Sequence, residues 1–163
     1  MAIALKSRAE KAGLRVEVEG CDISPVALEW AAEKAERRGL EVEFFHRDVV
    51  AEELPGGYDL VSSSLFLHHL SGPDSVAVLR NLVTAGRVGL VQDLLRTRKG
   101  YFLAMSTARM VTRSLVVRTD GPRSVRAAYS LPEIEDLARE AGLVGARIER
   151  CWPERFSLFL QAS

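Results

Sequence analysis

The chain has 163 residues, of which 47% are hydrophobic and 27% are charged, a composition typical of a globular domain with a sizeable core. Its 22 basic and 22 acidic side chains cancel, so its charge gives no reason to expect a nucleic acid partner. No stretch approaches the roughly 18 continuous apolar residues of a membrane span. Charged residues directly follow the apolar start Met1–Leu5, which argues against a signal peptide. We expect a cytoplasmic protein that forms one domain over 1–163, without stable membrane insertion.

Helices and strands alternate along most of the chain. The patterns predict helices over 2–12, 25–38, 73–85 and 130–141, and strands over 16–22, 41–47, 58–63, 87–93, 145–151 and 155–161. Such alternation favours a parallel sheet. The turn Trp152–Glu154 is too short for a crossover, so the last two strands should pair antiparallel. The predicted fold class is α/β, with a Rossmann-like, mostly parallel sheet, helices on both faces and an antiparallel C-terminal strand.

Residues 94–130 interrupt this alternation with a basic helical insert. The segment carries eight basic side chains against the single acid Asp120, interleaved with apolar and aromatic residues. Three interpretations are open for it. It forms a lid over an apolar, acidic or acyl-bearing substrate, a helix on a membrane surface, or a solvated face of the protein.

The two cysteines, Cys21 and Cys151, lie in apolar, strand-like segments. They form neither a CxxC pair nor a Cys/His cluster, the patterns that indicate a metal or redox site. We therefore expect two buried free thiols and no bound metal.

Asp22 ends the first predicted strand, directly before a helix that Ser24 would cap and Pro25 would begin. Nucleotide-binding α/β folds place at this point the acid that accepts hydrogen bonds from ribose hydroxyls. The sequence therefore predicts a nucleotide-binding role for Asp22. The alternative is that its carboxylate only caps the turn.

Four passages follow one another along the chain. GCDISPVALEWA and FFHRDVV each carry an acid after a strand, YDLVSSSLFLHHL contains two histidines, and AGLVGARIERCWPERFSLFLQA forms the closing hairpin. In order and spacing they resemble the class I S-adenosylmethionine-dependent methyltransferases that act on small molecules, and the likeness covers essentially the whole chain. Within that superfamily, HHL and the insert look most like methyltransferases of quinone biosynthesis and enzymes acting on phenolic or polyketide-like metabolites.

The resemblance implies S-adenosylmethionine as the cofactor and assigns six residues to it. Asp22 would hold the ribose hydroxyls, Ile23 would lie against the adenine, Asp48 and Val49 would meet the adenine ring, and Ser63 and Ser64 would line the methionine end. It also favours the lid interpretation of the insert. Pocket candidates there are Tyr101, Phe102, Met105 and Arg109.

The resemblance places His68 and His69 near the methyl-transfer site. A neutral imidazole can remove the proton of a phenol, whose pKa is near 10. We expect His69, or failing that His68, to be the base. The alternative is structural, with one histidine hydrogen-bonded at a helix start and the other on the surface.

The chain departs from the family at its start, where the first strand and its glycine-rich loop have no counterpart. In the family this strand is central, so its absence leaves two strand edges unpaired. The neighbours close up, a second chain fills the gap, or the sequence is an N-terminally shortened form, which we favour. We expect weak or no cofactor binding in that form.

The predicted function is therefore methyl transfer to a small aromatic, phenolic or lipid-like metabolite. A non-catalytic scaffold or subunit of a homo-oligomer is one alternative. A nicotinamide-dependent oxidoreductase is the other, because it shares the ribose-binding acid.

Overall fold

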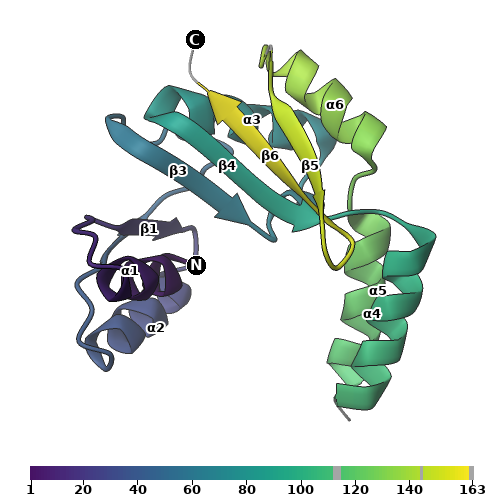
Figure 1. The fold of residues 1–163 in the computed structure, drawn as a ribbon, viewed down its shortest axis with the longest axis horizontal. Coiled ribbons are helices and arrows are strands. Elements are labelled where there is room, and N and C mark those ends of the chain that lie inside the picture. The colour runs from purple at the N-terminus through teal and green to yellow at the C-terminus, as the bar shows by residue number, and fades with distance from the viewer. Residues whose placement is uncertain (112–114, 144, 162–163) are drawn as a thin grey trace. The chain divides into compact units, whose positions relative to one another are not determined.

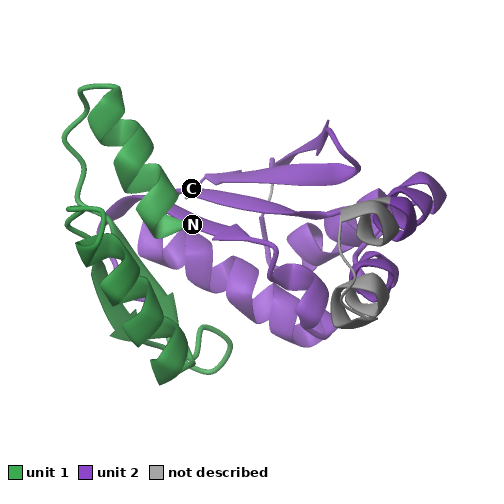
Figure 2. Cartoon of the chain, turned by 90° about the horizontal axis from the view of Figure 1, so that it is seen from below, with its two compact units in different colours: residues 1–53 green, residues 54–163 purple. Residues whose placement is uncertain are grey.

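The computed structural model describes residues 1–111, 115–143 and 145–161, with side chains left out at 107–120. The chain divides into two compact units, Met1–Glu53 and Leu54–Ser163 (Figure 2). The prediction of a single domain stays a prediction.

The first unit combines two helices with a two-stranded parallel sheet. Its elements are α1 (Ala2–Lys11), β1 (Glu19–Asp22), α2 (Pro25–Glu36) and β2 (Glu43–His46), and β1 pairs with β2 so that Asp22 lies opposite His46. The Ser24 side chain accepts a hydrogen bond from the Ala27 backbone N–H at 3.3 Å, which confirms the predicted cap of α2. Gly39, just beyond that helix, has a φ of +63°, a conformation that glycine adopts without strain.

The second unit is a four-stranded sheet with helices (Figure 1). Its elements are β3 (Tyr58–Ser64), the short 3₁₀ helix η1 (Leu67–His69), α3 (Gly72–Ala85), β4 (Gly86–Leu94), α4 (Arg98–Val111), α5 (Leu115–Ala127), α6 (Leu131–Glu140), β5 (Arg147–Cys151) and β6 (Arg155–Gln161). The strand order is β3-β4-β6-β5. β3 and β4 are parallel, and β6 runs antiparallel to both β4 and β5. The predicted parallel pairing with a reversed C-terminal strand is confirmed.

The core of this unit lies between the sheet and the helices α3 and α6, which contact each other. Leu79 of α3, Ile134 of α6 and Leu158 of β6 are all 0% exposed. Leu158 is paired across the sheet with Val91 of β4, itself 1% exposed. The core is thus built from segments far apart in the chain, and β6 closes it.

The insert forms two helices, α4 and α5, which pack together as an arm beside the sheet (Figure 1). Both ends of the arm are tied at its root. Leu95 forms a β-bridge with Tyr129, and the Arg96 N–H donates to the Tyr129 carbonyl at 2.9 Å. No helix in the described parts of the chain is both long enough and apolar enough to cross a membrane.

Among the described strands β1 and β3 share no ladder, so the two strand edges expected to be unpaired without the family's first strand are unpaired, and the neighbours do not close up. The structure corrects two details of the sequence prediction. The first strand begins at Glu19 rather than Val16, and the Val16 carbonyl instead accepts a hydrogen bond from Lys6 Nζ at 2.8 Å. The cysteines are free, as predicted, but both are half-buried rather than buried.

Leu158→Ala should lower the free energy of unfolding by about 3 kcal/mol, because it removes buried methyl groups and leaves a cavity. Urea unfolding followed by circular dichroism measures this change. Leu103→Ala is the matched control, since Leu103 on α4 is 43% exposed, and it should change stability by less than about 0.5 kcal/mol. Equal effects of the two variants would contradict this description of the core.

Candidate functional site

Four of the predicted cofactor-binding residues lie at one edge of the first unit's sheet. Asp22 ends β1, and Ile23 follows it with 58% of its surface exposed. Asp48 and Val49 follow β2, which ends at His46 opposite Asp22. The carboxyl ends of parallel strands are where open α/β sheets bind their ligands, and the four residues lie together at that edge.

Both acids cap the turn that follows them. Asp22 Oδ1 accepts from the Ser24 N–H at 2.9 Å, and Asp48 Oδ1 accepts from the N–H groups of Val50 and Ala51 at 3.0 and 3.3 Å. One carboxylate oxygen of Asp22 therefore caps its turn, as the alternative interpretation expected, and one oxygen of Asp48 does the same in the turn after β2. Within the described residues, Oδ2 of neither acid makes a hydrogen bond, which leaves it able to accept from a ligand.

The two remaining cofactor candidates and the two predicted catalytic histidines lie close together in the second unit. Ser63 and Ser64 end β3, and His68 and His69 form the histidine turn, η1, directly after it. Between them, Leu65 has a φ of 56°, a left-handed conformation that costs a leucine roughly 1 kcal/mol or more. Strain of this kind persists only where surrounding contacts fix the backbone.

Asp93 supplies those contacts from the end of β4. Its Oδ1 lies 2.6 Å from His68 Nδ1 and accepts from the Leu94 N–H at 2.6 Å. Its Oδ2 accepts from the N–H groups of Phe66 and His68 at 2.9 and 3.2 Å. One buried carboxylate, 1% exposed, thereby fixes both the backbone of the turn and the ring of His68.

The pKa of Asp93 is set by opposing effects. Burial raises it, but hydrogen bonds from the His68 ring and from the backbone of Leu94 and His68, with the charge of His68, lower it, and the net shift is below the ordinary value. Asp93 is therefore ionised at neutral pH and can only accept hydrogen bonds. A hydrogen must then sit on Nδ1 of His68, and Nε2 is the ring nitrogen that Asp93 does not engage.

The two histidines differ in their surroundings. The His68 side chain is 5% exposed, whereas His69 is exposed, and their ring centroids are 4.0 Å apart with a tilt of 42°. This arrangement matches the alternative of one hydrogen-bonded and one surface histidine. It also makes His68, rather than His69, the imidazole whose orientation is fixed.

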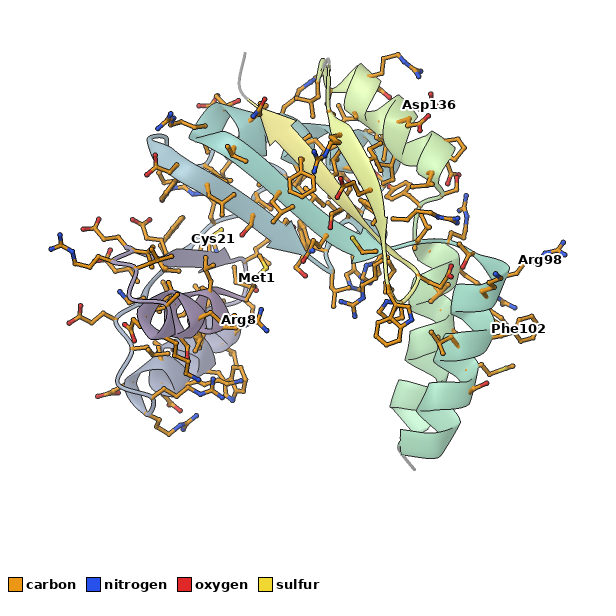
Figure 3. The ribbon with its side chains drawn as sticks, viewed as in Figure 1. Met1, Arg8, Cys21, Arg98, Phe102 and Asp136 are labelled. Atoms are coloured by element: carbon orange, nitrogen blue, oxygen red, sulfur yellow. The ribbon has the colours of Figure 1, made fainter. Side chains whose placement is uncertain are left out.

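The pocket candidates of the insert lie on α4. Tyr101 packs edge-on against Phe102 with their ring centroids 5.9 Å apart. The central carbon of the Arg126 guanidinium, on α5, lies 4.8 Å from the centroid of the Tyr101 ring. Phe102 is 60% exposed and points away from the sheet (Figure 3). Met105 is half-buried, and the side chain of Arg109 lies outside the described residues. The described side chains thus show an aromatic cluster on the arm rather than a closed pocket.

Sequence reasoning missed Asp93 as a site residue. A signal was present, because Asp93 is an acid at the carboxyl end of a predicted strand, as Asp22 and Asp48 are. What the sequence did not show is its pairing with His68, which is 25 residues away in the chain.

Comparison with known proteins places the chain in a family. The family model described as "Methyltransferase domain" matches residues 2–89, more than half of the chain. The protein therefore belongs to the methyltransferase-domain family, and the resemblance predicted from the sequence is confirmed.

Curated relatives support the same family. The ubiquinone biosynthesis O-methyltransferase of Burkholderia pseudomallei (strain 1710b) is 31% identical over 136 residues, which cover 81% of this chain and 57% of the relative. That of Burkholderia orbicola (strain MC0-3) is 33% identical over 107 residues, covering 64% of this chain and 46% of the relative. The chain thus spans about half the length of the curated relatives it matches.

Solved structures share the fold. The S-adenosylmethionine-dependent methyltransferase SibL in its apo form has a TM-score of 0.70 at 21% identity, covering 99% of this chain and 46% of that one. Magnesium protoporphyrin IX methyltransferase (ChlM) from Synechocystis PCC 6803 with bound SAH has a TM-score of 0.63 at 19% identity, covering 99% and 68%. These likenesses confirm the predicted Rossmann-like α/β fold.

Asp93→Asn should lower the free energy of unfolding by about 3 kcal/mol at neutral pH, because the amide cannot accept from all four donors. The pKa of Asp93 is lowered by folding, so its stabilising contribution is present above the ordinary value of about 4 and is lost as pH falls through the lowered value. The difference between wild type and variant should therefore shrink below about pH 4.

Urea unfolding between about pH 3 and pH 7 measures this difference. Asp136→Asn is the control, since Asp136 is an exposed acid on α6 (Figure 3). A wild-type advantage over Asp93→Asn that stays constant through the acid range would show that the carboxylate charge is not what stabilises the turn.

Proposed function

We propose that the protein is an S-adenosylmethionine-dependent methyltransferase that methylates a hydroxyl group of a small aromatic, phenolic or lipid-like metabolite. The observation that carries this proposal is the buried Asp93–His68 pair at the carboxyl end of the parallel strands β3 and β4, in a chain of the methyltransferase-domain family. The names of the relatives, O-methyltransferases of ubiquinone biosynthesis, support the class of acceptor.

Six residues would hold the cofactor. The free Oδ2 atoms of Asp22 and Asp48 fit the hydroxyl and amino donors of an adenosine, and the exposed side chain of Ile23 offers an apolar contact for its ring. Val49 would contribute its backbone there, and Ser63 and Ser64 would lie at the methionine end. Bound S-adenosylmethionine supplies an electrophilic methyl group.

His68 would accept the proton of the acceptor hydroxyl. Its Nδ1–H donates to Asp93, so Nε2 carries the free lone pair, and the buried carboxylate stabilises the imidazolium that forms. Positioning of the two reactants supplies most of the acceleration in such a displacement. His69 is the rival base, and its exposed ring lacks an orienting carboxylate in the described contacts.

The basic arm α4–α5 would act as the lid over the acceptor. Tyr101, with Met105 and Arg109 on the same helix, would line a site for an apolar molecule that carries negative charge, whereas Phe102 is turned to solvent. We further propose a single domain that works in the cytoplasm without a nucleic acid partner. The balanced charge of the chain supports the last point.

One observation favours a second candidate, a non-catalytic subunit of a homo-oligomer. Among the described strands, β1 and β3 each have a partner on one side only, and an open strand edge is a template for association. An oligomer without affinity for S-adenosylhomocysteine, seen by light scattering and calorimetry, would favour this candidate over the enzyme.

Asp22→Ala should abolish or weaken by at least about tenfold the binding of S-adenosylhomocysteine, because the ribose loses a charged hydrogen-bond acceptor. Isothermal titration calorimetry measures the affinity. Asp136→Ala removes an exposed acid of α6 and should leave it unchanged. Binding by wild type that survives unaltered in Asp22→Ala would refute the placement of the ribose.

His68→Gln should lower kcat for methyl transfer by about 10² or more while S-adenosylhomocysteine still binds, because the proton acceptor is lost. The assay uses 3,4-dihydroxybenzoate as a phenolic acceptor. Asp136→Asn, which changes an exposed acid of α6, is the control and should retain the wild-type rate. A larger loss in His69→Gln than in His68→Gln would assign the base to His69.

A further inference from the structure

Tyr129 lies at the root of the arm and forms a hydrogen bond to the residue that follows the histidine turn. Its backbone is fixed by the bridge to Leu95 and by the Arg96 N–H. Its hydroxyl donates to the Leu70 carbonyl at 3.0 Å and lies 3.0 Å from Ser75 Oγ. Because a phenol has one proton, Ser75 must be the donor in the second bond. A chain of two hydrogen bonds therefore runs from Ser75 at the start of α3, through Tyr129, to the residue after η1.

The turn is thus held at both ends by side chains from other elements. Asp93 accepts the N–H groups of Phe66 and His68 where the turn begins, and Tyr129 engages the carbonyl of Leu70 where it ends. The left-handed backbone of Leu65 stands just before the first anchor. Hydrogen bonds at one end alone would leave the other end of η1 free to move, whereas hydrogen bonds at both ends fix the backbone of its three residues.

The residues around Tyr129 are buried. Ser75 is 0% exposed and Leu95 is 2% exposed, and Ala128, next to Tyr129, is 0% exposed. The phenol ring is therefore attached to closely packed backbone at the root of the arm.

We propose that Tyr129 is a positioning residue for methyl transfer, whose hydroxyl sets the exit of the histidine turn and thereby the placement of the His68 and His69 rings. This inference rests on the proposed function. Asp93 orients the His68 ring about its own axis, and Tyr129 fixes where the backbone carries that ring. Because Tyr129 lies two residues beyond the end of α5, the position of the arm and the geometry of the turn are mechanically linked.

Tyr129→Phe in the intact chain removes both hydrogen bonds and keeps the ring. We expect the imidazole signals of His68 and His69 in ¹H–¹³C NMR spectra to shift. We expect kcat with 3,4-dihydroxybenzoate to fall about tenfold at an unchanged KM for S-adenosylmethionine, the size of effect that one lost orienting hydrogen bond produces. Ser75→Ala removes only the second bond and should give a smaller shift in the same direction.

Tyr58→Phe is the matched control, because it removes a phenol hydroxyl from the opposite end of β3. It should leave the histidine signals and kcat unchanged. Unchanged imidazole signals in Tyr129→Phe, or equal changes in the control, would overturn the role of Tyr129. Wild-type protein without turnover would instead contradict the proposed function, since the NMR signals are read without methyl transfer and still decide whether Tyr129 sets the turn.

Discussion

The second unit depends on a buried negative charge. A carboxylate removed from water is costly unless each of its oxygens accepts hydrogen bonds, and Asp93 meets this condition only when the end of β4, the turn after β3 and the ring of His68 are all in place. The need to satisfy one side chain therefore fixes the relation between two parallel strands at their carboxyl ends. It also allows Leu65 to keep a backbone conformation that a leucine in a free loop would leave.

The features that sequence reasoning captured are local ones. The cap of α2 by Ser24 and the capping box of Ser130 with Glu133 involve residues three apart, so their patterns appear directly in the sequence. The order of helices and strands is captured for the same reason. Asp22 and Asp48 were found by their place at strand ends, and the structure shows that both make capping hydrogen bonds to the turn that follows.

What escaped prediction depends on distant partners. The pairing of Asp93 with His68 and the reach of Tyr129 to Leu70 join segments that only the folded sheet brings together. The two edge strands of the four-stranded sheet differ in charge. β5 has charged residues at Arg147, Glu149 and Arg150, which discourage further pairing. β3 is largely uncharged, a pattern typical of an internal strand.

The arm of α4 and α5 leaves the sheet and returns to it at one point. Leu95 and Tyr129 are bridged, so the chain between them is a closed excursion whose ends meet in fixed register. The entropic cost of bringing the two ends of such a segment together rises only slowly with its length. A longer or different segment between Leu95 and Tyr129 would therefore leave the pairing of the neighbouring strands unchanged. The arm can thereby vary in length and sequence between these two bridged residues while the strands on either side keep their pairing, and a library confined to the arm would vary its surface without testing the fold each time.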